Sequence, residues 1–251
     1  MDWATHALLF VVSLLANIFS AFAGGGAGLL QFPLLIFLGL PFGVALATHK
    51  VASVALGIGA TLRNLREGHL QRRLTLHIVI CGVPGVILGA SLILFVPDRS
   101  AEIALGLLTV GLGLYSVLSP QLGQTPRTPA QSLRHYAIGG LVLFVIGALN
   151  GSLTSGTGLF VTLWLVRWFG MDYKGAVAHT LVLVGLFWNG SGAVTLGLIG
   201  SIQWHWLPAL LAGSLLGGYI GAHLAITTGN RWIKRVFEVI TLAVGSKLIL
   251  G

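Results

Sequence analysis

Apolar segments follow one another along almost the whole chain and leave no stretch for a separate soluble domain. Charged residues make up only 8% of the 251 residues, whereas hydrophobic residues make up 55%. Soluble domains carry about 25% charged residues, so this chain cannot cover itself with a polar surface. The sequence therefore predicts an all-α polytopic membrane protein.

The same order of segments occurs twice, on either side of a polar link that contains several prolines. In each half two short segments come first and three longer ones follow. Glycine and alanine matches at a nearly constant offset support an internal repeat, such as Gly85 and Gly89 with Gly217 and Gly221. We predict a first repeat at 1–119 (segments 8–22, 29–40, 44–62, 75–96 and 101–119), a linker at 120–135, and a second repeat at 136–251 (segments 136–149, 158–170, 175–199, 204–226 and 232–250).

The distribution of Lys and Arg predicts that the two repeats are inverted relative to each other. Cytoplasmic loops are rich in these residues. The 63–74 loop is basic and is expected inside, whereas its counterpart, 200–203, has no Lys or Arg and is expected outside. Both termini are then extracytoplasmic, and equivalent loops lie on opposite faces, as is typical of secondary transporters. The basic residues expected in the cytoplasm are Arg63, Arg66, Arg72, Arg73, Arg127, Arg134, Arg231, Lys234 and Arg235.

The first two segments of each repeat are too short for ordinary membrane spans, which need about 20 residues. Segments 29–40 and 158–170 are well below this length, and their partners 8–22 and 136–149 are also short. Each pair predicts a helical hairpin, at 8–40 and 136–170, either re-entrant or crossing fully, with its tip near the membrane midplane. The glycine run Gly24–Gly28 lies at the first tip, and the Ser/Thr/Gly-rich stretch Asn150–Gly158 lies at the second.

The hairpin tips predict a substrate-binding pocket at the interface between the repeats. The first N–H groups of a helix have no partner within the helix and attract anions, and irregular backbone at membrane depth must face protein or a water-filled cavity. The alternative is that the glycines only allow close packing and the hydroxyl groups only cap helices. The candidate binding residues at the tips are Gly24, Gly25, Gly26, Ala27, Asn150, Ser152, Thr154, Ser155, Gly156 and Thr157.

Further candidate binding residues lie on the longer segments. A lysine inside a membrane segment, such as Lys50, is a candidate functional residue, although its side chain could instead extend to the outer interface. His49 has a near counterpart in His179 of the other repeat, and the alternative for both is an ordinary hydrogen-bonded histidine. The candidates outside the tips are Gln31, Thr48, His49, Lys50, His179, Thr180 and Asn189.

Other features are expected to be structural or argue against enzyme activity. Glu238 is expected to pair with Lys234 or Arg235, and the small-residue stripes at 85–89 and 213–221 are expected to allow close helix contact. The chain has no Walker A motif, no HExxH motif, no Cys/His cluster and no evident nucleophile–base pair. We therefore expect a non-enzyme without catalytic residues, metal or cofactor. The net charge of +8 is attributed to topology and contact with lipid headgroups, not to nucleic-acid binding.

The chain resembles the TauE/SafE sulfite-exporter-like permeases over its whole length. The resemblance rests on Ala23–Gly28, Gln31–Leu35, Gly39–Pro41 and Ala45–Thr48, with echoes at Gly151–Gly158 and Ala176–Thr180.

This resemblance implies a carrier in the bacterial or archaeal cytoplasmic membrane for small sulfur-containing anions, such as sulfite, sulfonates or sulfoacetate, working by alternating access. The alternatives are a channel-like anion conduit or an accessory membrane subunit of a sulfur-metabolism complex. The sequence leaves open the anion, the direction of transport, the coupling ion and the oligomeric state, a homodimer included.

Overall fold

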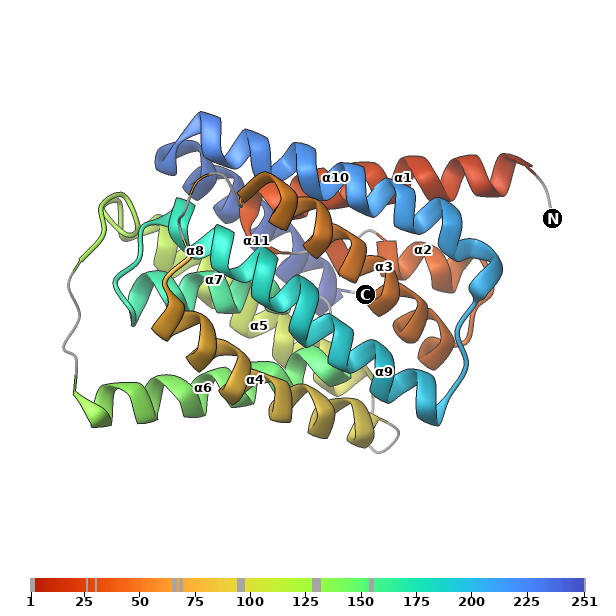
Figure 1. Cartoon of the computed structure of the whole chain (residues 1–251), viewed down its shortest axis with the longest axis horizontal. Helices are drawn as coiled ribbons and strands as arrows, with labels where there is room; N and C mark the ends of the chain where they lie inside the picture. Colours follow the sequence, from red (N-terminus) through yellow and green to blue (C-terminus); the bar gives the residue numbers. More distant parts are fainter. Residues whose placement is uncertain are drawn as a thin grey trace.

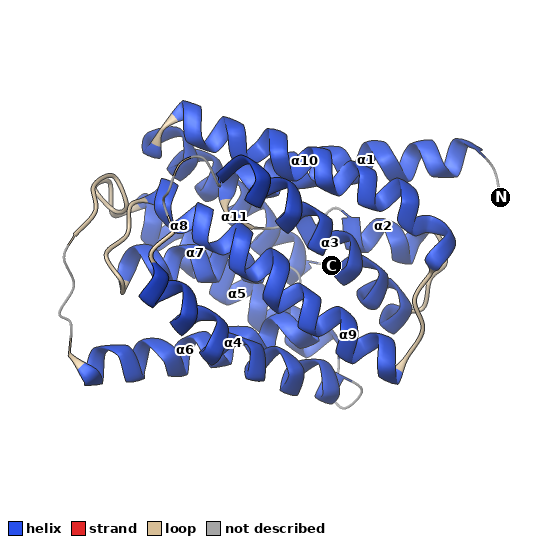
Figure 2. Cartoon of the chain, in the orientation of Figure 1, coloured by secondary structure: helices blue, strands red, loops and turns tan. Residues whose placement is uncertain are grey.

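The computed structural model describes residues 3–25, 27–29, 31–64, 67, 70–93, 98–127, 132–153 and 156–250. Within these ranges the secondary structure is helical, without strands (Figure 2). The elements before the link are α1 (Trp3–Ala23), the 3₁₀ turn η1 (Ala27–Leu29), α2 (Gln31–Phe37), α3 (Phe42–Asn64), α4 (Arg72–Leu92) and α5 (Asp98–Val117). After the link come α6 (Leu133–Ser152), α7 (Thr157–Arg167), α8 (Tyr173–His179), the π-helix η3 (Thr180–Trp188), α9 (Asn189–Ile199), the 3₁₀ turn η4 (Trp204–Trp206), α10 (Leu207–Thr228) and α11 (Asn230–Leu250).

The all-α polytopic prediction is confirmed. Among the described residues, six helical stretches are long and apolar enough to cross a membrane: α1, α3, α4, α6, the continuous stretch α8–η3–α9, and η4–α10. Helices α5 and α11 have similar lengths but fall outside this set, and they pack extensively against each other.

The first arm of each hairpin is longer than predicted. Helix α1 has 21 residues and α6 has 20, which is about 30 Å at 1.5 Å per residue. The predicted arms, 8–22 and 136–149, cover only the largely apolar part of each helix, but a helix can extend into polar residues at either end. Helix α6, for example, begins at Leu133 and includes the polar residues that precede position 136. In α6, the Ser132 side chain caps this polar start by accepting a 3.1 Å hydrogen bond from the His135 N–H. The second arms, α2 and α7, are short as predicted, with 7 and 11 residues.

The hairpin arms pack against helices from the opposite half of the chain. Helix α1 lies beside α10 along one edge of the molecule, and α6 lies beside α4 along the other (Figure 1). Between these two pairs run α3 and the α8–η3–α9 stretch, which also pack against each other. Helices α1, α3 and α10 begin at one end of the long axis, whereas α4, α6 and α11 begin at the other (Figure 1).

Small residues bring both helix pairs into backbone contact, as predicted. A Cβ atom added at Gly217 of α10 would lie 2.6 Å from the Leu14 carbonyl oxygen of α1. At Gly85 of α4 it would lie 2.1 Å from the Phe144 carbonyl oxygen of α6. Because both distances are far below van der Waals contact, larger residues at these glycines would separate the helices.

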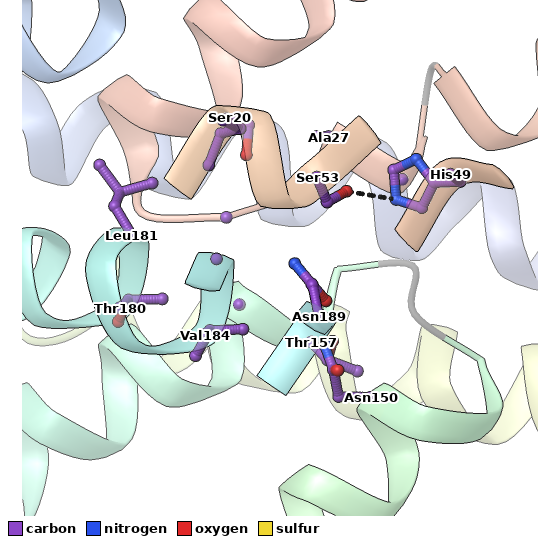
Figure 3. Close-up of a pocket in the computed structure, with 15 residues that line it drawn as sticks. Ser20, Ala27, His49, Ser53, Asn150, Thr157, Thr180, Leu181, Val184 and Asn189 are labelled. Atoms are coloured by element: carbon purple, nitrogen blue, oxygen red, sulfur yellow. Dashed lines mark hydrogen bonds between the residues drawn. The ribbon is translucent and has the colours of Figure 1, made fainter. Parts of the chain in front are cut away.

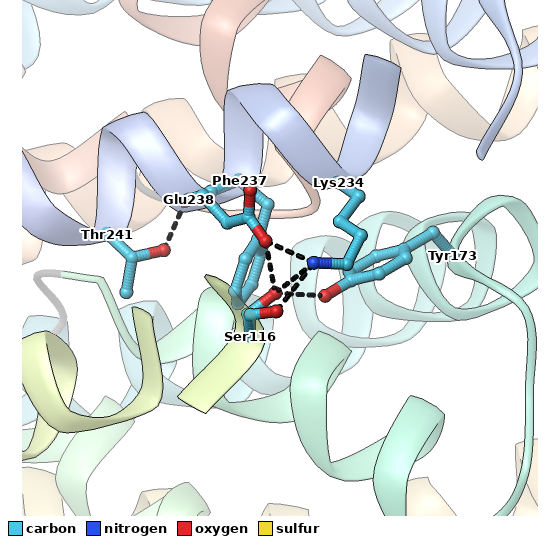
Figure 4. A network of polar contacts seen from close by, with 6 residues as sticks. All are labelled: Ser116, Tyr173, Lys234, Phe237, Glu238 and Thr241. Atoms are coloured by element: carbon cyan, nitrogen blue, oxygen red, sulfur yellow. Dashed lines mark hydrogen bonds and ion pairs between the residues drawn. The ribbon is translucent and has the colours of Figure 1, made fainter. Parts of the chain in front are cut away.

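A buried polar network joins α5, α8 and α11 (Figure 4). Lys234 pairs with Glu238, which confirms the expected pairing, and its Nζ atom donates a 2.6 Å hydrogen bond to the Ser116 carbonyl oxygen. The Ser116 hydroxyl also lies 2.9 Å from the Tyr173 hydroxyl. The acidic side chain Glu238 is therefore held by a structural pair away from the hairpin tips.

Candidate functional site

The two hairpin tips meet inside the bundle. Helix α1 ends at Ala23, and Gly24 and Gly25 follow with φ angles of +84° and +144°, which favour glycine. A Cβ atom at Gly25 would lie 2.5 Å from the carbonyl carbon of Gly158, in the first turn of α7. Thr162 Oγ1 of α7 donates a 2.7 Å hydrogen bond to the Gly24 carbonyl oxygen. The glycines therefore do allow close packing, as the alternative reading holds, but the contact they make joins the two tips.

A cavity of about 50 Å³ lies beside this contact. Its wall combines hydroxyl, amide and imidazole groups with backbone and apolar side chains, and none of the described residues that line it is Asp or Glu. Figure 3 shows that the polar groups come from both halves of the chain. The lining residues are Ser20, Gly25, Ala27, Gly28, His49, Ser53, Leu56, Asn150, Thr157, Gly158, Thr180, Leu181, Val184, Gly185 and Asn189.

Lys50 lies behind this wall and bridges the two halves. Its side chain is fully buried, so the alternative in which it extends to the outer interface is wrong. Its Nζ atom donates hydrogen bonds to the carbonyl oxygen and the side-chain Oδ1 of Asn150, both at 2.6 Å, and to Oδ1 of Asn189 at 3.1 Å. Three acceptors around one nitrogen match the three N–H groups of an ammonium ion.

This arrangement fixes the direction of the two side-chain amides. Because the Oδ1 atoms of Asn150 and Asn189 face Lys50, their NH₂ groups point away from it. The Asn150 amide nitrogen donates to Thr157 Oγ1 at 2.8 Å. The Asn189 amide nitrogen points toward the space between the two halves (Figure 3). Lys50 thus turns hydrogen-bond donors, rather than acceptors, toward the cavity.

His49 belongs to a second buried network, which begins between α1 and α10. Gln31 Nε2 donates to Ser13 Oγ at 2.8 Å, and Gln31 Oε1 lies 2.7 Å from His49 Nδ1. On the other side of the ring, His49 Nε2 lies 3.2 Å from Ser53 Oγ (Figure 3). Gln31 therefore supports the cavity through His49 without lining it.

Thr48 and His179 lie away from the cavity and hold segments of the opposite half. Thr48 Oγ1 accepts a 2.9 Å hydrogen bond from the Gln203 N–H, next to η4. His179 Nε2 accepts a 3.0 Å hydrogen bond from the Gln71 N–H, at the start of α4. His179 follows Thr48 by 131 positions and Gln203 follows Gln71 by 132, which are the offsets of the predicted repeat. At the predicted offset of 131 positions, His179 corresponds to Thr48 and Thr180 corresponds to His49.

The remaining predicted site residues that the structure describes do not line the cavity. Gly24 contacts Thr162, as described above. Ser152 donates to the Ala148 carbonyl oxygen within its own helix at 3.0 Å, and Gly156 precedes α7 with a φ angle of +73°. The predicted site residues Gly26, Thr154 and Ser155 lie outside the described part of the chain.

Several lining residues were not predicted, although some left a signal in the sequence. Ser53 lies four residues after His49 on the same face of α3, so helical spacing could have found it. Thr162 does not line the cavity but contacts the lining residue Thr180 at a separation of 18 residues, the separation between Gln31 and His49. The other lining residues of the π-helix η3, Leu181, Val184 and Gly185, left no such signal.

Comparisons with known proteins agree on a membrane transporter. The family model described as sulfite exporter TauE/SafE matches residues 9–248. A probable membrane transporter protein of Haemophilus influenzae is 31% identical over 97% of this chain and 94% of its own length. Probable membrane transporter protein ORF9 of a Sinorhizobium species is 28% identical over 99% and 94%. The probable membrane transporter protein YfcA of Escherichia coli K12 is 29% identical over 96% and 88%.

Proposed function

The chain belongs to the TauE/SafE sulfite exporter family of membrane transporters, and we propose that it is a secondary transporter of small sulfur-containing anions. We further propose that sulfite, a sulfonate or a sulfoacetate-like compound crosses the cytoplasmic membrane by alternating access. The site is the cavity between the two hairpin tips.

The observation that carries this proposal is the cavity wall with Lys50 behind it. Hydroxyl groups and the Asn189 amide face the space, and no described carboxylate does. A buried lysine needs compensation for its charge, and its described hydrogen-bond acceptors, Asn150 and Asn189, are uncharged. An anion in the cavity would supply the missing negative charge. A cation in the cavity would be repelled by the positive charge of Lys50.

The arrangement of the helices supports inverted repeats. If a two-fold axis relates the halves, α1 corresponds to α6 and α10 corresponds to α4. The contact of α1 with α10 then has its equivalent in the contact of α6 with α4. Helices α4, α6 and α11 begin at one end of the molecule, and each has Lys or Arg in its first turn (Figure 1). Helices α1, α3 and α10 begin at the opposite end and have no Lys or Arg there. With the basic end in the cytoplasm, both termini of this arrangement are extracytoplasmic.

The contacts of Thr48 and His179 suggest how the two ends of the transporter open in turn. Each joins one half to a loop of the other half, at opposite ends of the molecule. Release of the Thr48–Gln203 contact would free one end, and release of the His179–Gln71 contact would free the other. In alternating access, the two contacts break in different states of the cycle.

Transport by the purified protein in liposomes tests the function. We expect saturable uptake of radiolabelled sulfite or ethanesulfonate that is accelerated by unlabelled anion on the opposite side. A channel would conduct without this acceleration, and an accessory subunit alone would transport nothing. A screen with acetate and phosphate then defines the anion class.

Two lysine variants test the site. Lys50→Met removes the cation behind the cavity and should lower anion affinity by about tenfold or more, which corresponds to about 1.4 kcal/mol. Lys234→Met is the matched control, because Lys234 is also a buried lysine in a polar network. Both variants should unfold at lower temperature, but only Lys50→Met should weaken binding. Unchanged affinity in Lys50→Met would remove the site from this cavity.

A further inference from the structure

The hydrogen bonds around His49 fix which ring nitrogen can exchange a proton. Gln31 Nε2 donates to the hydroxyl oxygens of Ser13 at 2.8 Å and Ser214 at 3.3 Å, so its Oε1 must face His49. An amide oxygen only accepts, and His49 Nδ1 therefore carries a hydrogen and donates across 2.7 Å. The nitrogen left to gain or lose a proton is Nε2, on the cavity side, 3.2 Å from Ser53 Oγ.

The protonation of Nε2 determines what Ser53 offers to the cavity. When His49 is neutral, Nε2 accepts the Ser53 hydroxyl hydrogen, and the Ser53 lone pairs face an occupant of the cavity. When His49 is protonated, Nε2 donates to Ser53 Oγ, and the hydroxyl hydrogen is released toward the occupant. One proton thus adds a positive charge at the wall and converts Ser53 from an acceptor into a donor.

The charges near His49 come from one other residue. Neutral side chains make up the hydrogen-bond network that continues from His49 through Gln31, the ring that packs on His49, and the described cavity wall on α1, α6 and the η3–α9 stretch: Ser13, Asn17, Ser20, Gln31, Phe32, Asn150, Thr180, Asn189 and Ser214. Lys50, the next residue of α3, is the charged group, and it faces the cavity wall from behind. With neutral His49 the site therefore carries one positive charge, which matches a monoanion. With protonated His49 it carries two, which matches a dianion.

We infer that His49 is the proton-binding residue of this site and that a dianion binds together with one proton. This inference rests on the proposed function, and it names the coupling ion. The proton comes from solvent, binds the lone pair of Nε2, and leaves when the anion leaves, without any bond of the anion being broken. A proton carried across with the dianion reduces by one the net charge that crosses the membrane.

Binding and proton uptake are measured together by titration calorimetry of the purified protein in buffers that differ in ionisation enthalpy. The probes are sulfoacetate, a dianion near neutral pH, and ethanesulfonate, a monoanion of similar size. We expect sulfoacetate to take up close to one proton and ethanesulfonate to take up almost none at a pH where His49 is neutral in the empty site. The affinity for sulfoacetate should rise as the pH falls, by up to roughly tenfold per pH unit, because binding favours the protonated histidine.

His49→Gln removes the titrating nitrogen and should abolish both the proton uptake and this pH dependence. His77→Gln is the matched control, since His77 is a partly buried histidine of α4 that does not line the cavity. Sulfoacetate binding by the wild type without proton uptake, or uptake that persists in His49→Gln, would overturn the role of His49 and leave the proposed function standing. Where His49→Gln does not fold, His49→Asn takes its place, and absence of proton uptake by the wild type overturns the inference without any variant. Absence of any binding of either anion by the wild type would overturn both.

Discussion

At the scale of single residues, the orientation of one amide decides the chemistry of the cavity. Asn189 accepts from Lys50 through Oδ1, so its NH₂ group is the end that faces the space between the halves. An amide can present either end to a ligand, and here the neighbouring ammonium selects the donor end. Donors without opposing carboxylates suit an anion because hydrogen bonds to a charged acceptor are stronger than neutral ones.

Asn189→Asp tests this orientation with a change of almost no volume. The new carboxylate pairs with Lys50 and places negative charge at the cavity wall, so we expect anion affinity to fall by about tenfold or more. Asn64→Asp is the control, since Asn64 is a buried asparagine near the end of α3 that does not line the cavity. Equal affinity losses in the two variants, measured by calorimetry, would contradict a local role for Asn189.

At the scale of secondary-structure elements, three irregular stretches build the site: the two hairpin tips and the π-helix η3. The hairpin tips interrupt the helices so that backbone of one half touches backbone of the other at Gly25 and Gly158. The π-helix η3 places Thr180, Leu181, Val184 and Gly185 along the cavity. Short π-helical stretches are rare and occur often at functional sites, which agrees with the place of η3 here.

Gly25→Ala tests the contact between the tips. The added methyl group would overlap the Gly158 backbone and would require a φ angle of +144° that alanine rarely adopts. We expect a lower unfolding temperature and loss of anion transport in liposomes, with about 1–3 kcal/mol of the cost due to backbone strain. Gly39→Ala supplies the control, because Gly39 has a φ angle of +94° but nothing within 4 Å of an added Cβ. If Gly39→Ala inactivates transport as completely as Gly25→Ala, then strain alone explains the effect.

At the scale of the whole molecule, each half of the chain packs its first helix against a helix of the other half. Lys50, Thr48 and His179 all bond across the same division. Neither half therefore buries its glycine faces alone, which argues that the halves fold as one interlocked unit.

Site-directed labelling tests the inverted arrangement. Cys81 is the single cysteine, so a Cys81→Ser background permits one new cysteine at a time. Ala4→Cys and Thr125→Cys place exposed thiols at the start of α1 and in the central link. We expect a membrane-impermeant maleimide to label the first from outside the cell and the second only after the membrane is opened. Labelling of both from the same side would contradict inverted repeats.

The sequence alone determined that this protein lies in a membrane, the order of its helices and many of the residues that line the cavity. Apolar length and sparse charge predict membrane helices because lipid tolerates little else. The glycine runs predict interrupted hairpins because glycine weakens helices and permits close contact. Seven of the predicted residues line the cavity: Gly25, Ala27, His49, Asn150, Thr157, Thr180 and Asn189.

Only the tertiary structure decided the partners of those residues. Contacts between distant segments bury Lys50 toward Asn150 and Asn189. They also place Thr48 and His179 away from the cavity, at opposite ends of the molecule. Local sequence patterns indicate which polar groups a helix carries, but they do not indicate which group of another helix will form hydrogen bonds with them. A buried polar group takes its role from its hydrogen-bond partner, and for Lys50, Thr48 and His179 that partner lies in the other half of the chain.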